Sequence, residues 1–390
     1  MKILVICQYY DPEPFRIGDI CRALKDRGHQ VTVVTGQPNY PEGEIYPGYE
    51  KKNRRHEVVD GVEVHRCFTI PRKSGALHRF LNYYSFMFSS CRFVKKLPGD
   101  YDVVFVNQLS PVMMAKAGIR YGSKHNKKVV MYCLDLWPES LIAGGIGRNS
   151  LIYKFFHRVS RKVYTKMDEI LVTSREFIGY LKQQFGIKEE KIHYLPQYAE
   201  DLFGTLPEVP KREGLNLTFA GNIGEVQSVE TILQAARKLQ GESITFHIVG
   251  SGSDLERLQK LAADWALQNV IFYGRKPVSE MPEFYAKADA LLVTLKADPV
   301  LSLTLPGKVQ SCMAAGKPII GAVDGETARV IHEAGCGYCG PAEDGERLAE
   351  NILQFANADK AQMGQNAKAY YKRQFDKTKF IDSLEAVLRG

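Results

Sequence analysis

Short apolar and β-branched runs alternate with segments of helical periodicity along the whole chain. One such segment is 20–27, where Ile20, Ala23 and Leu24 share a face and Gly28 follows as a stop signal. Strands and helices that alternate in this way predict an α/β fold built on doubly wound parallel sheets. In the first half we expect strands at 2–10, 30–35, 62–70, 103–106, 129–134, 170–173 and 192–195.

The same pattern restarts in the second half, after a segment of different composition. Residues 196–213 hold three prolines and many charges, so we interpret them as a linker between two domains, with a hinge near 196–210. A length of 390 residues also suits two domains better than one. Beyond the linker we expect strands at 215–220, 245–249, 270–273 and 290–294, and helices at 228–239, 254–263 and 370–388.

The stretch LTLPGKVQSCMAAGKPII at 303–320 combines a short helix with a start suited to anions. We expect the helix at 310–315, ended by Gly316. Pro306 suits its first turn, and Gly307 allows a ligand to approach the backbone. Free N–H groups beside Lys308 would then form an anion site. The alternative is an ordinary helix–turn–strand connection.

The predicted strand ends of the second half carry glycine with polar or basic neighbours, namely Gly221, Asn222, Gly250, Ser251, Arg275 and Lys276. Together with 303–320 they predict the rim of a Rossmann-like sheet that holds a phosphorylated ligand. A dinucleotide site is excluded in the first half. No GxGxxG follows the first strand, and the second strand ends in Thr35 and Gly36 instead of an acid.

Two features of the first half are candidates for chemistry. Asp135 directly follows the strand at 129–134, where open α/β sheets place ligands. The alternative role for Asp135 is to cap the next helix. Arg16 and Gly18 lie in and after the loop that follows the first strand.

The formal net charge of +8 belongs to the first half alone. Residues 1–200 hold 31 Lys and Arg against 20 Asp and Glu, or +11, whereas 201–390 hold 21 against 24, or −3. Segments 66–99 and 148–166 contain thirteen basic residues, no acid and many aromatics. They indicate either contact with a membrane surface or lipid-linked ligand, or ordinary helices with a basic side in water. Nucleic acid is disfavoured because no nucleic-acid-binding motif accompanies the charge.

The eight cysteines form no Cys/His cluster at metal-ligand spacing, and the one CxxC, at Cys336 and Cys339, has no second pair. We therefore expect reduced thiols in the cytoplasm. The opening residues do not resemble a signal peptide, and no apolar run reaches 18 residues. A cytoplasmic protein that visits the inner face of the cell membrane is the expected localisation.

The combined motifs resemble the GT-B glycosyltransferases, and within them family 4 of retaining enzymes. The similarity is carried by GNIGEVQ (221–227), IVGSGSDLERL (248–258), FYGRKPVSEMPEFYAKADALL (272–292) and PGKVQSCMAAGKPII (306–320). Residues 8–49 and CLDLWPES (133–140) are similar to a subgroup of N-acetyl-L-fucosamine transferases in bacterial O-antigen and capsule assembly.

This resemblance implies two Rossmann-like domains that face a cleft and close when the donor binds. Domain 1–200 would bind a lipid-linked acceptor, domain 201–369 a UDP-type nucleotide sugar, and the helix at 370–390 would return to the first domain. No cofactor or metal is expected, because no Asp-x-Asp pair stands at a strand end. The implied catalytic residues are Asp135, Lys308 and Arg16. The implied donor-binding residues are Gly18, Gly221, Asn222, Gln227, Gly250, Ser251, Arg275, Lys276, Pro306, Gly307, Lys308 and Ser311.

The chain departs from the family pattern at four positions. Asn222 and Gln227 stand where many members have Arg and Lys, and Leu303 and Ser311 stand where many have glutamates. Two other functions therefore stay open. A sugar-nucleotide epimerase would need acid and base groups, for which Asp135 and Glu139 are the candidates, and a non-catalytic sugar-nucleotide-binding subunit would explain the lost glutamates.

Overall fold

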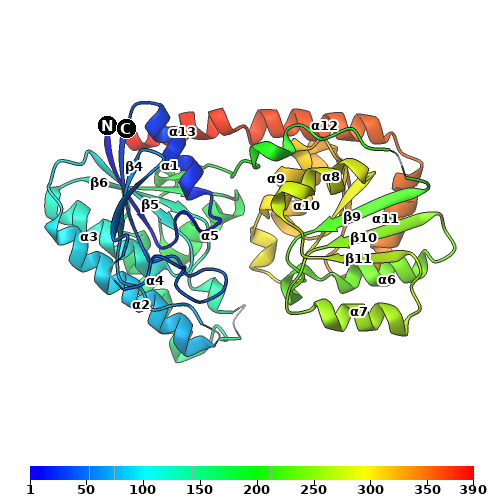
Figure 1. Ribbon diagram of the computed structural model, residues 1–390, viewed down its shortest axis with the longest axis horizontal. Helices are drawn as coiled ribbons and strands as arrows, with labels where there is room; N and C mark the ends of the chain where they lie inside the picture. Colours follow the sequence, from blue (N-terminus) through cyan, green and yellow to red (C-terminus); the bar gives the residue numbers. More distant parts are fainter. Residues whose placement is uncertain (52, 74, 143–144, 211) are drawn as a thin grey trace. The chain divides into compact units, whose positions relative to one another are not determined.

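The computed structural model describes residues 1–51, 53–73, 75–142, 145–210 and 212–390. The chain forms two compact units (Figure 1): unit 1 comprises 1–195 together with 381–390, and unit 2 comprises 196–380. The domain boundaries predicted after residues 200 and 369 lie near these positions but do not coincide with them. Among the described helices, none is long and apolar enough to cross a bilayer.

Unit 1 is built on an eight-stranded sheet in the order β3-β4-β2-β1-β5-β6-β7-β8. Strand order reverses between β1 and β5, so the carboxyl ends of these strands flank a topological switch point. β3 was not predicted; it pairs antiparallel with β4 and makes this sheet mixed. The strands are β1 (Lys2–Cys7), β2 (Gln30–Thr35), β3 (His56–Val59), β4 (Val62–Arg66), β5 (Val103–Gln108), β6 (Lys128–Cys133), β7 (Glu169–Val172) and β8 (Ile192–Tyr194).

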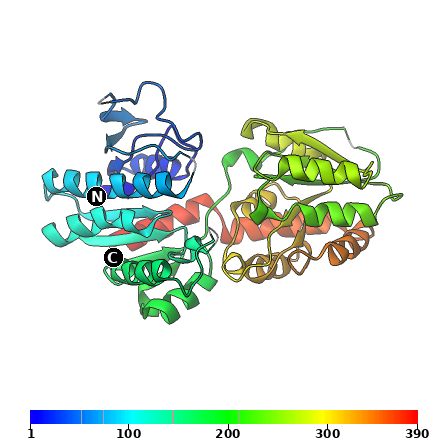
Figure 2. The same cartoon turned by 90° about the horizontal axis from the view of Figure 1, so that it is seen from below.

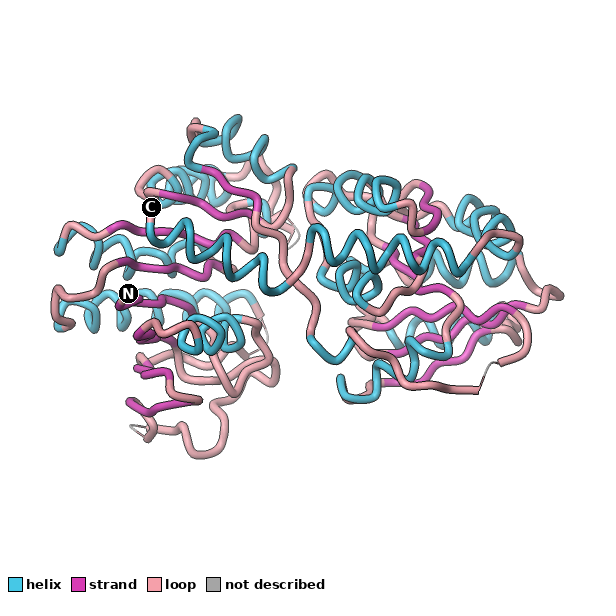
Figure 3. Tube along the Cα trace, turned by 90° about the horizontal axis from the view of Figure 1, so that it is seen from above, coloured by secondary structure: helices cyan, strands magenta, loops and turns pink. Residues whose placement is uncertain are grey.

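Helices cover the sheet of unit 1, and Figure 3 shows them (cyan) in front of and behind its strands (magenta). The central strands read as nearly continuous apolar runs because both of their faces are buried. The helices are α1 (Ile17–Asp26), α2 (Ala76–Phe93), α3 (Lys116–His125), α4 (Leu151–Tyr164) and α5 (Glu176–Phe185), joined by short 3₁₀ turns that include η2 (Val112–Ala115) and η3 (Glu139–Leu141).

Unit 2 contains a six-stranded parallel sheet in the order β11-β10-β9-β12-β13-β14, with its switch point between β9 and β12. Residues of β12 alternate between the two apolar cores on either face of this sheet. Leu291 and Val293 belong to the core that contains Tyr285 and Val309, whereas Ala290 and Leu292 belong to the core that contains Ile232 and Leu258. The strands are β9 (Leu215–Ala220), β10 (Ile244–Val249), β11 (Val270–Gly274), β12 (Ala290–Thr294), β13 (Ile319–Ala322) and β14 (Gly337–Gly340).

The helices of unit 2 follow its strands in regular alternation. Figure 1 shows α6 and α7 on one side of β9–β11 and α8–α10 on the other. Their bounds are α6 (Glu230–Lys238), α7 (Leu255–Asp264), α8 (Met281–Lys287), α9 (Gly307–Ala314), α10 (Gly325–Ala334), α11 (Gly345–Ala356) and α12 (Lys360–Gln374), with the 3₁₀ turns η5 (Asp201–Phe203), η6 (Glu225–Gln227) and η8 (Leu301–Leu303).

The continuous helix predicted at 370–388 is wrong, because the chain breaks after Gln374 and restarts as α13 (Lys377–Arg389). Phe375 at the break is buried, and the side chain of Asp376 accepts a hydrogen bond from the backbone N–H of Lys379 at 3.0 Å. This side-chain cap starts a new helix where periodicity alone continues the old one.

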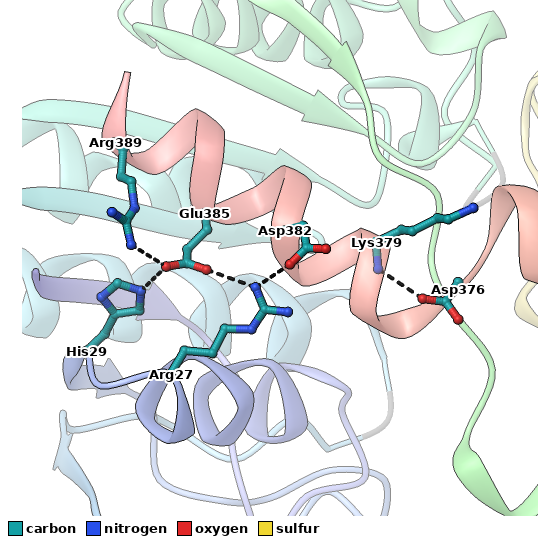
Figure 4. A network of polar contacts seen from close by, with 7 residues as sticks. All are labelled: Arg27, His29, Asp376, Lys379, Asp382, Glu385 and Arg389. Carbon is teal, nitrogen blue, oxygen red and sulfur yellow. Dashed lines mark hydrogen bonds and ion pairs between the residues drawn. The ribbon is translucent and has the colours of Figure 1, made fainter.

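The end of α13 is held in unit 1 by the polar network of Figure 4. Glu385 accepts hydrogen bonds from His29 at 2.6 Å, from Arg389 at 2.7 Å and from Arg27 at 2.9 Å. Arg27 also pairs with Asp382 at 2.5 Å. The Arg389 and Arg27 guanidiniums hold the pKa of Glu385 down to about 2, so this carboxylate stays charged at neutral pH.

The segment interpreted as a linker between the domains, 196–213, packs within unit 2 as far as the structure describes it; residue 211 lies outside the described residues. The ring of Phe203 stacks on Tyr285 with centroids 4.8 Å apart. The backbone N–H of Ala199 donates to the hydroxyl of Tyr371 at 3.1 Å. The polar and proline-rich composition therefore indicated the boundary correctly. It did not indicate that the segment packs against the rest of unit 2.

Candidate functional sites of the two units

The candidate site of unit 2 lies at the switch point between β9 and β12, where the strands end at one edge of the sheet. Lys308, on the first turn of α9, reaches this edge. Its Nζ lies 4.1 Å from the centroid of the Phe219 ring and donates to Oε1 of Gln227 at 2.9 Å. The structure thus brings together three groups from β9, η6 and α9.

Lys308 is half-buried, and among the described residues no carboxylate forms an ion pair with it. Burial lowers the pKa of its ammonium to about 8. This cation is partly removed from water and is contacted only by an amide oxygen and an aromatic ring. An anion that binds beside it would therefore stabilise its charge. This is the electrostatic signature expected of a phosphate-binding position.

Gln227 is positioned from the strand side of the same edge. Thr294, the last residue of β12, donates its hydroxyl to the carbonyl of Gln227 at 2.6 Å. This contact fixes the backbone of η6 across the switch point, and the side-chain amide of Gln227 then accepts the hydrogen bond from Lys308. A neutral amide at position 227 therefore supports the one cation of this cluster instead of adding a second.

The glycines of the rim serve first to bring two loops together. A Cβ on Gly250 would lie 1.8 Å from the carbonyl oxygen of Gly221, and Gly250 has a φ of +146°. The N–H of Ile223 donates to the carbonyl of Ser251 at 2.9 Å, which closes the same contact. Asn222 is exposed beside it. The loops after β9 and β10 are thus in direct backbone contact, and only glycine at position 250 leaves room for this contact.

The basic pair after β11 is more loosely held. Arg275 and Lys276 are both exposed, and Lys276 lies 3.9 Å from Glu280 in an exposed ion pair. A hollow of about 500 Å³ opens in unit 2 beside Ser228, Ser253 and Lys296, at the loops that follow β9, β10 and β12. A larger hollow of about 780 Å³ is lined by Arg237, Trp265 and Glu346 and contains none of the predicted site residues.

Helix α9 begins at Gly307, three residues earlier than predicted, with Pro306 as its N-cap residue. Its first turn is therefore part of the candidate site. Gln310 is buried, and its amide nitrogen, in the orientation that satisfies both carbonyls, donates to Pro306 at 2.8 Å and Gly307 at 3.2 Å. Gln310 thus stabilises the helix start and does not face a ligand.

A carboxylate that sequence reasoning missed lies next to Ser311. Glu200, from the segment before η5, places its Oε2 3.4 Å from the hydroxyl of Ser311. Ser311 stands at one of the two positions where the family glutamates were expected, and Leu303, at the other, lies in η8. An acid absent from α9 is thus supplied by a segment 111 residues away in the chain.

In unit 1, the N-terminus of α1 is already occupied by a side chain. A Cβ on Gly18 would lie 2.2 Å from Oδ2 of Asp11, which pairs with Arg22 at 2.8 Å. Arg16 stands at the N-cap position of α1 without a side-chain cap hydrogen bond, and its charge opposes the rise that burial causes in the pKa of Tyr132. Of the two residues predicted here, Gly18 contacts an acid and Arg16 interacts with neighbouring side chains.

Asp135 has a carboxylate that two serine hydroxyls hold in place. Its oxygens accept hydrogen bonds from the hydroxyls of Ser110, in the loop after β5, and Ser140, the latter at 2.6 Å. Trp137 Nε1 donates to the hydroxyl of Ser110 at 2.7 Å, and this hydrogen bond fixes the position of Ser110 beside Asp135. Burial raises the pKa of Asp135, and the two serine hydroxyls and the Leu136 N–H oppose this shift. Such an environment is typical of a working acid or base.

Two other glutamates of unit 1 are held by the fold. Glu139, the second acid of the epimerase hypothesis, is buried and accepts from Tyr153 at 2.7 Å, Tyr180 at 2.8 Å and Arg148 at 3.0 Å. Glu13 was not predicted. It is buried, burial raises its pKa to about 7, and its carboxylate accepts N–H groups of the loop at 37–49. Both groups stabilise local structure.

The described residues contain one cluster with the geometry of metal ligands, on the β3–β4 hairpin. Nε2 of His56 and Nε2 of His65 lie 3.0 Å and 3.2 Å from Oε1 of Glu63. It includes none of the residues predicted for donor or acceptor, and the prediction that the reaction uses no metal stays a prediction.

Comparisons with known proteins follow the division of the chain. Residues 16–197 match the model of Glycosyltransferase Family 4, and residues 208–370 match that of Glycosyl transferases group 1. WbjE of Pseudomonas aeruginosa, named as a probable glycosyltransferase, is 26% identical over 85% of this chain and 86% of its own. WcaI of Escherichia coli K12, whose name assigns it to glycosyl transfer in colanic acid biosynthesis, is 25% identical over the full length of both chains.

A solved structure with a similar fold is HepE of Anabaena in complex with UDP, with a TM-score of 0.73, 14% identity and full coverage of both chains. The predicted fold class is therefore confirmed, with the first sheet mixed instead of wholly parallel. The chain joins a Glycosyltransferase Family 4 domain to a Glycosyl transferases group 1 domain and is a glycosyltransferase of the GT-B fold.

Proposed function

We propose that this enzyme transfers a sugar from a UDP-linked donor to a polyprenyl-diphosphate-linked saccharide during assembly of a bacterial surface polysaccharide such as O-antigen or capsule. The sugar we propose is an N-acetylated deoxyhexosamine such as N-acetyl-L-fucosamine, transferred with retention of configuration. The observation that carries the donor assignment is Lys308, which is half-buried at the switch point of unit 2 and has no carboxylate partner in the part of the chain that the structure describes.

The comparisons support the substrate classes of this proposal. HepE was crystallised with UDP, and WcaI is named for colanic acid biosynthesis. The resemblance of the opening residues to N-acetyl-L-fucosamine transferases is the basis for the proposed sugar.

In unit 2 the leaving diphosphate would be stabilised by the start of α9 together with Lys308. Negative charge grows on the bridging oxygen as the sugar departs, so a fixed cation and free N–H groups lower the barrier most where that charge develops. Glu200 beside Ser311 would accept hydrogen bonds from hydroxyl groups of the donor. Glu200 would thus supply a carboxylate to the donor site, where positions 303 and 311 lack the glutamates of the family pattern.

In unit 1 Asp135 would accept the proton of the attacking acceptor hydroxyl. Ser110 and Ser140 hold both of its oxygens, and Trp137 fixes Ser110. Its raised pKa improves it as a base, while the serine hydrogen bonds keep it ionised. The same carboxylate would orient the acceptor sugar.

The donor assignment is tested by thermal shift against UDP, GDP, CMP and TDP sugars. A ligand present at 100 times its Kd stabilises the fold by about 2.7 kcal/mol, so the correct nucleotide should separate clearly from the others. We expect UDP sugars to give the largest shift and a lipid-linked acceptor to be glycosylated. Conversion of UDP-HexNAc without acceptor would instead support an epimerase, and a shift without turnover would support a binding subunit.

The acceptor assignment is supported by exposed apolar residues on α2 and α4 of unit 1. Phe80, Tyr84 and Phe88 form a stripe along α2, with ring centroids 4.3 Å and 6.1 Å apart. Leu151 and Phe155 protrude from α4 and are 83% and 53% exposed. Both helices contact η2, and Figure 2 shows α2 (light blue) and α4 (green) in unit 1 from below. Exposed basic residues lie in the same two segments of the chain, including Arg79, Lys95, Lys96, Lys154 and Arg158.

Unit 1 is therefore expected to sediment with anionic vesicles and less with neutral ones. Each cation near an anionic surface contributes about 1 kcal/mol, and this attraction should fade as salt rises from about 0.1 M to 1 M. Replacing Arg79, Lys95 and Lys96 by Gln, or Phe80 and Phe88 by Ser, should release the protein. The exposed Val278 of unit 2, changed to Ser, is the matched control. Equal sedimentation on both vesicle types would contradict docking.

A further inference from the structure

Arg72, in the segment between β4 and α2, is half-buried among aromatic rings. Its guanidinium lies 5.9 Å from the ring centroid of Tyr40 and 5.8 Å from that of Tyr83. Its backbone N–H donates to Oδ1 of Asn39 at 2.9 Å, which fixes the segment. Among the described residues, no carboxylate forms an ion pair with Arg72.

Two other arginines of unit 1 differ from Arg72, because each forms an ion pair with a carboxylate. Arg66 is buried and pairs with Glu57 at 2.7 Å, and Arg22 pairs with Asp11 at 2.8 Å. Removing a charge from water without an opposite charge is costly. Arg72 alone of these three lacks an acid, so its charge is left available to an anion from outside the chain.

A second group next to Arg72 also lacks a partner. Tyr9 is 2% exposed, and among the described residues its hydroxyl has no acceptor for its proton. Its ring is fixed by stacking on Phe15 at 4.9 Å and by Tyr40 at 5.8 Å. Burial raises the pKa of Tyr9 and the nearby Arg72 opposes the shift, so the hydroxyl is protonated and close to the guanidinium. A buried, unpaired donor beside an unpaired cation indicates a missing acceptor.

We propose that Arg72 and Tyr9, with the hydroxyl of Tyr83, bind the diphosphate of the lipid-linked acceptor. This inference rests on the proposed function and specifies which residues of unit 1 recognise the acceptor. Diphosphate oxygens accept hydrogen bonds from a guanidinium and from hydroxyls together, and their charge matches a cation held by neutral groups.

The order of groups along unit 1 agrees with the order of groups in such an acceptor. Tyr83 is on α2, the helix whose exposed stripe carries Phe80 and Phe88, and it also interacts electrostatically with Asp135. A polyprenyl diphosphate sugar has lipid, diphosphate and sugar in sequence. The apolar stripe, the Arg72 group and Asp135 can contact these three parts in turn.

The test compares two acceptors that carry the same sugar and alkyl chain, joined through a diphosphate or through a neutral ether. Arg72→Gln is expected to raise the KM of the diphosphate acceptor on the order of 10- to 100-fold. The KM of the ether acceptor and of the donor should not change. Tyr9→Phe, which keeps the ring and removes the hydroxyl, should give a smaller rise on the diphosphate acceptor only.

Arg72→Lys keeps the charge and should restore part of the diphosphate preference, whereas Arg120→Gln removes an exposed charge from α3 and should leave the preference intact. An equal loss with both acceptors in Arg72→Gln would overturn the proposal. Farnesyl diphosphate titrated into donor-free protein gives a second measurement, with inorganic pyrophosphate to separate free from lipid-linked anion. Binding that is unchanged in Arg72→Gln would also overturn it. Arg72-dependent binding without any transfer would support the site and contradict the proposed function.

Discussion

Lys308→Met is expected to weaken UDP-sugar binding and to lower kcat/KM for the donor by roughly 10- to 150-fold, because a charge-assisted contact to a diphosphate contributes about 1.5–3 kcal/mol. The side chain of methionine fills similar space over Phe219, so the fold should be retained. The measurement is steady-state kinetics with donor varied, together with UDP titration calorimetry. An unchanged kcat/KM would remove Lys308 from the site.

The same residue should make donor binding depend on pH. Burial lowers the pKa of Lys308 to about 8, so the ammonium loses its proton above that pH in the free enzyme. An anionic donor favours the charged form, and binding above pH 8 must therefore take up a proton. Donor affinity should fall by about tenfold per pH unit above 8 in the wild type. Lys308→Arg, which stays charged, should bind with little change between pH 7 and 9.

Lys317 provides the matched control for this pH dependence. Burial also lowers its pKa, but its ammonium donates to the carbonyls of Ala288 at 2.7 Å and Ala286 at 3.0 Å. Lys317→Met should reduce stability and leave the pH dependence of donor binding unchanged. A wild-type affinity that is flat from pH 7 to 9.5 would contradict the role of Lys308.

Asp135→Asn is expected to lower kcat by about 10²- to 10⁴-fold with donor affinity nearly unchanged, because general-base catalysis contributes this much and the amide keeps the shape of the carboxylate. Asp168→Asn is the matched control. Its carboxylate accepts the N–H of Val129 at 2.7 Å, at the start of β6, whereas Asp135 follows the end of that strand. Asp168→Asn should lower stability without a comparable loss of kcat.

Ser140→Ala separates a catalytic from a structural role of Asp135. The Ser140 hydroxyl opposes the rise that burial causes in the pKa of Asp135, so its removal should raise that pKa further. The acid side of the kcat–pH profile should then move to higher pH, while kcat on the alkaline side is nearly retained. A profile that keeps its position in Ser140→Ala would show that Asp135 does not act as the base.

The sequence by itself determined most of the strands and the two-part α/β architecture. Buried parallel strands are continuous apolar runs, so 30–35, 215–220 and 290–294 were predicted with the bounds that the structure has. The glycine-bearing strand ends of unit 2 were predicted for the same local reason. The antiparallel strand β3 was missed because its residues alternate between exposed and half-buried positions and include a histidine and a glutamate.

Only the tertiary structure decided which side chains meet. Glu200 reaches Ser311, Ser110 reaches Asp135, and Gln227 reaches Lys308 from positions that are 111, 25 and 81 residues apart in the chain. Local periodicity fixes which face of a strand or helix a residue occupies, but the spatial order of the strands fixes its neighbours. That order depends on how all the apolar faces are buried together, and no single stretch of sequence contains this information.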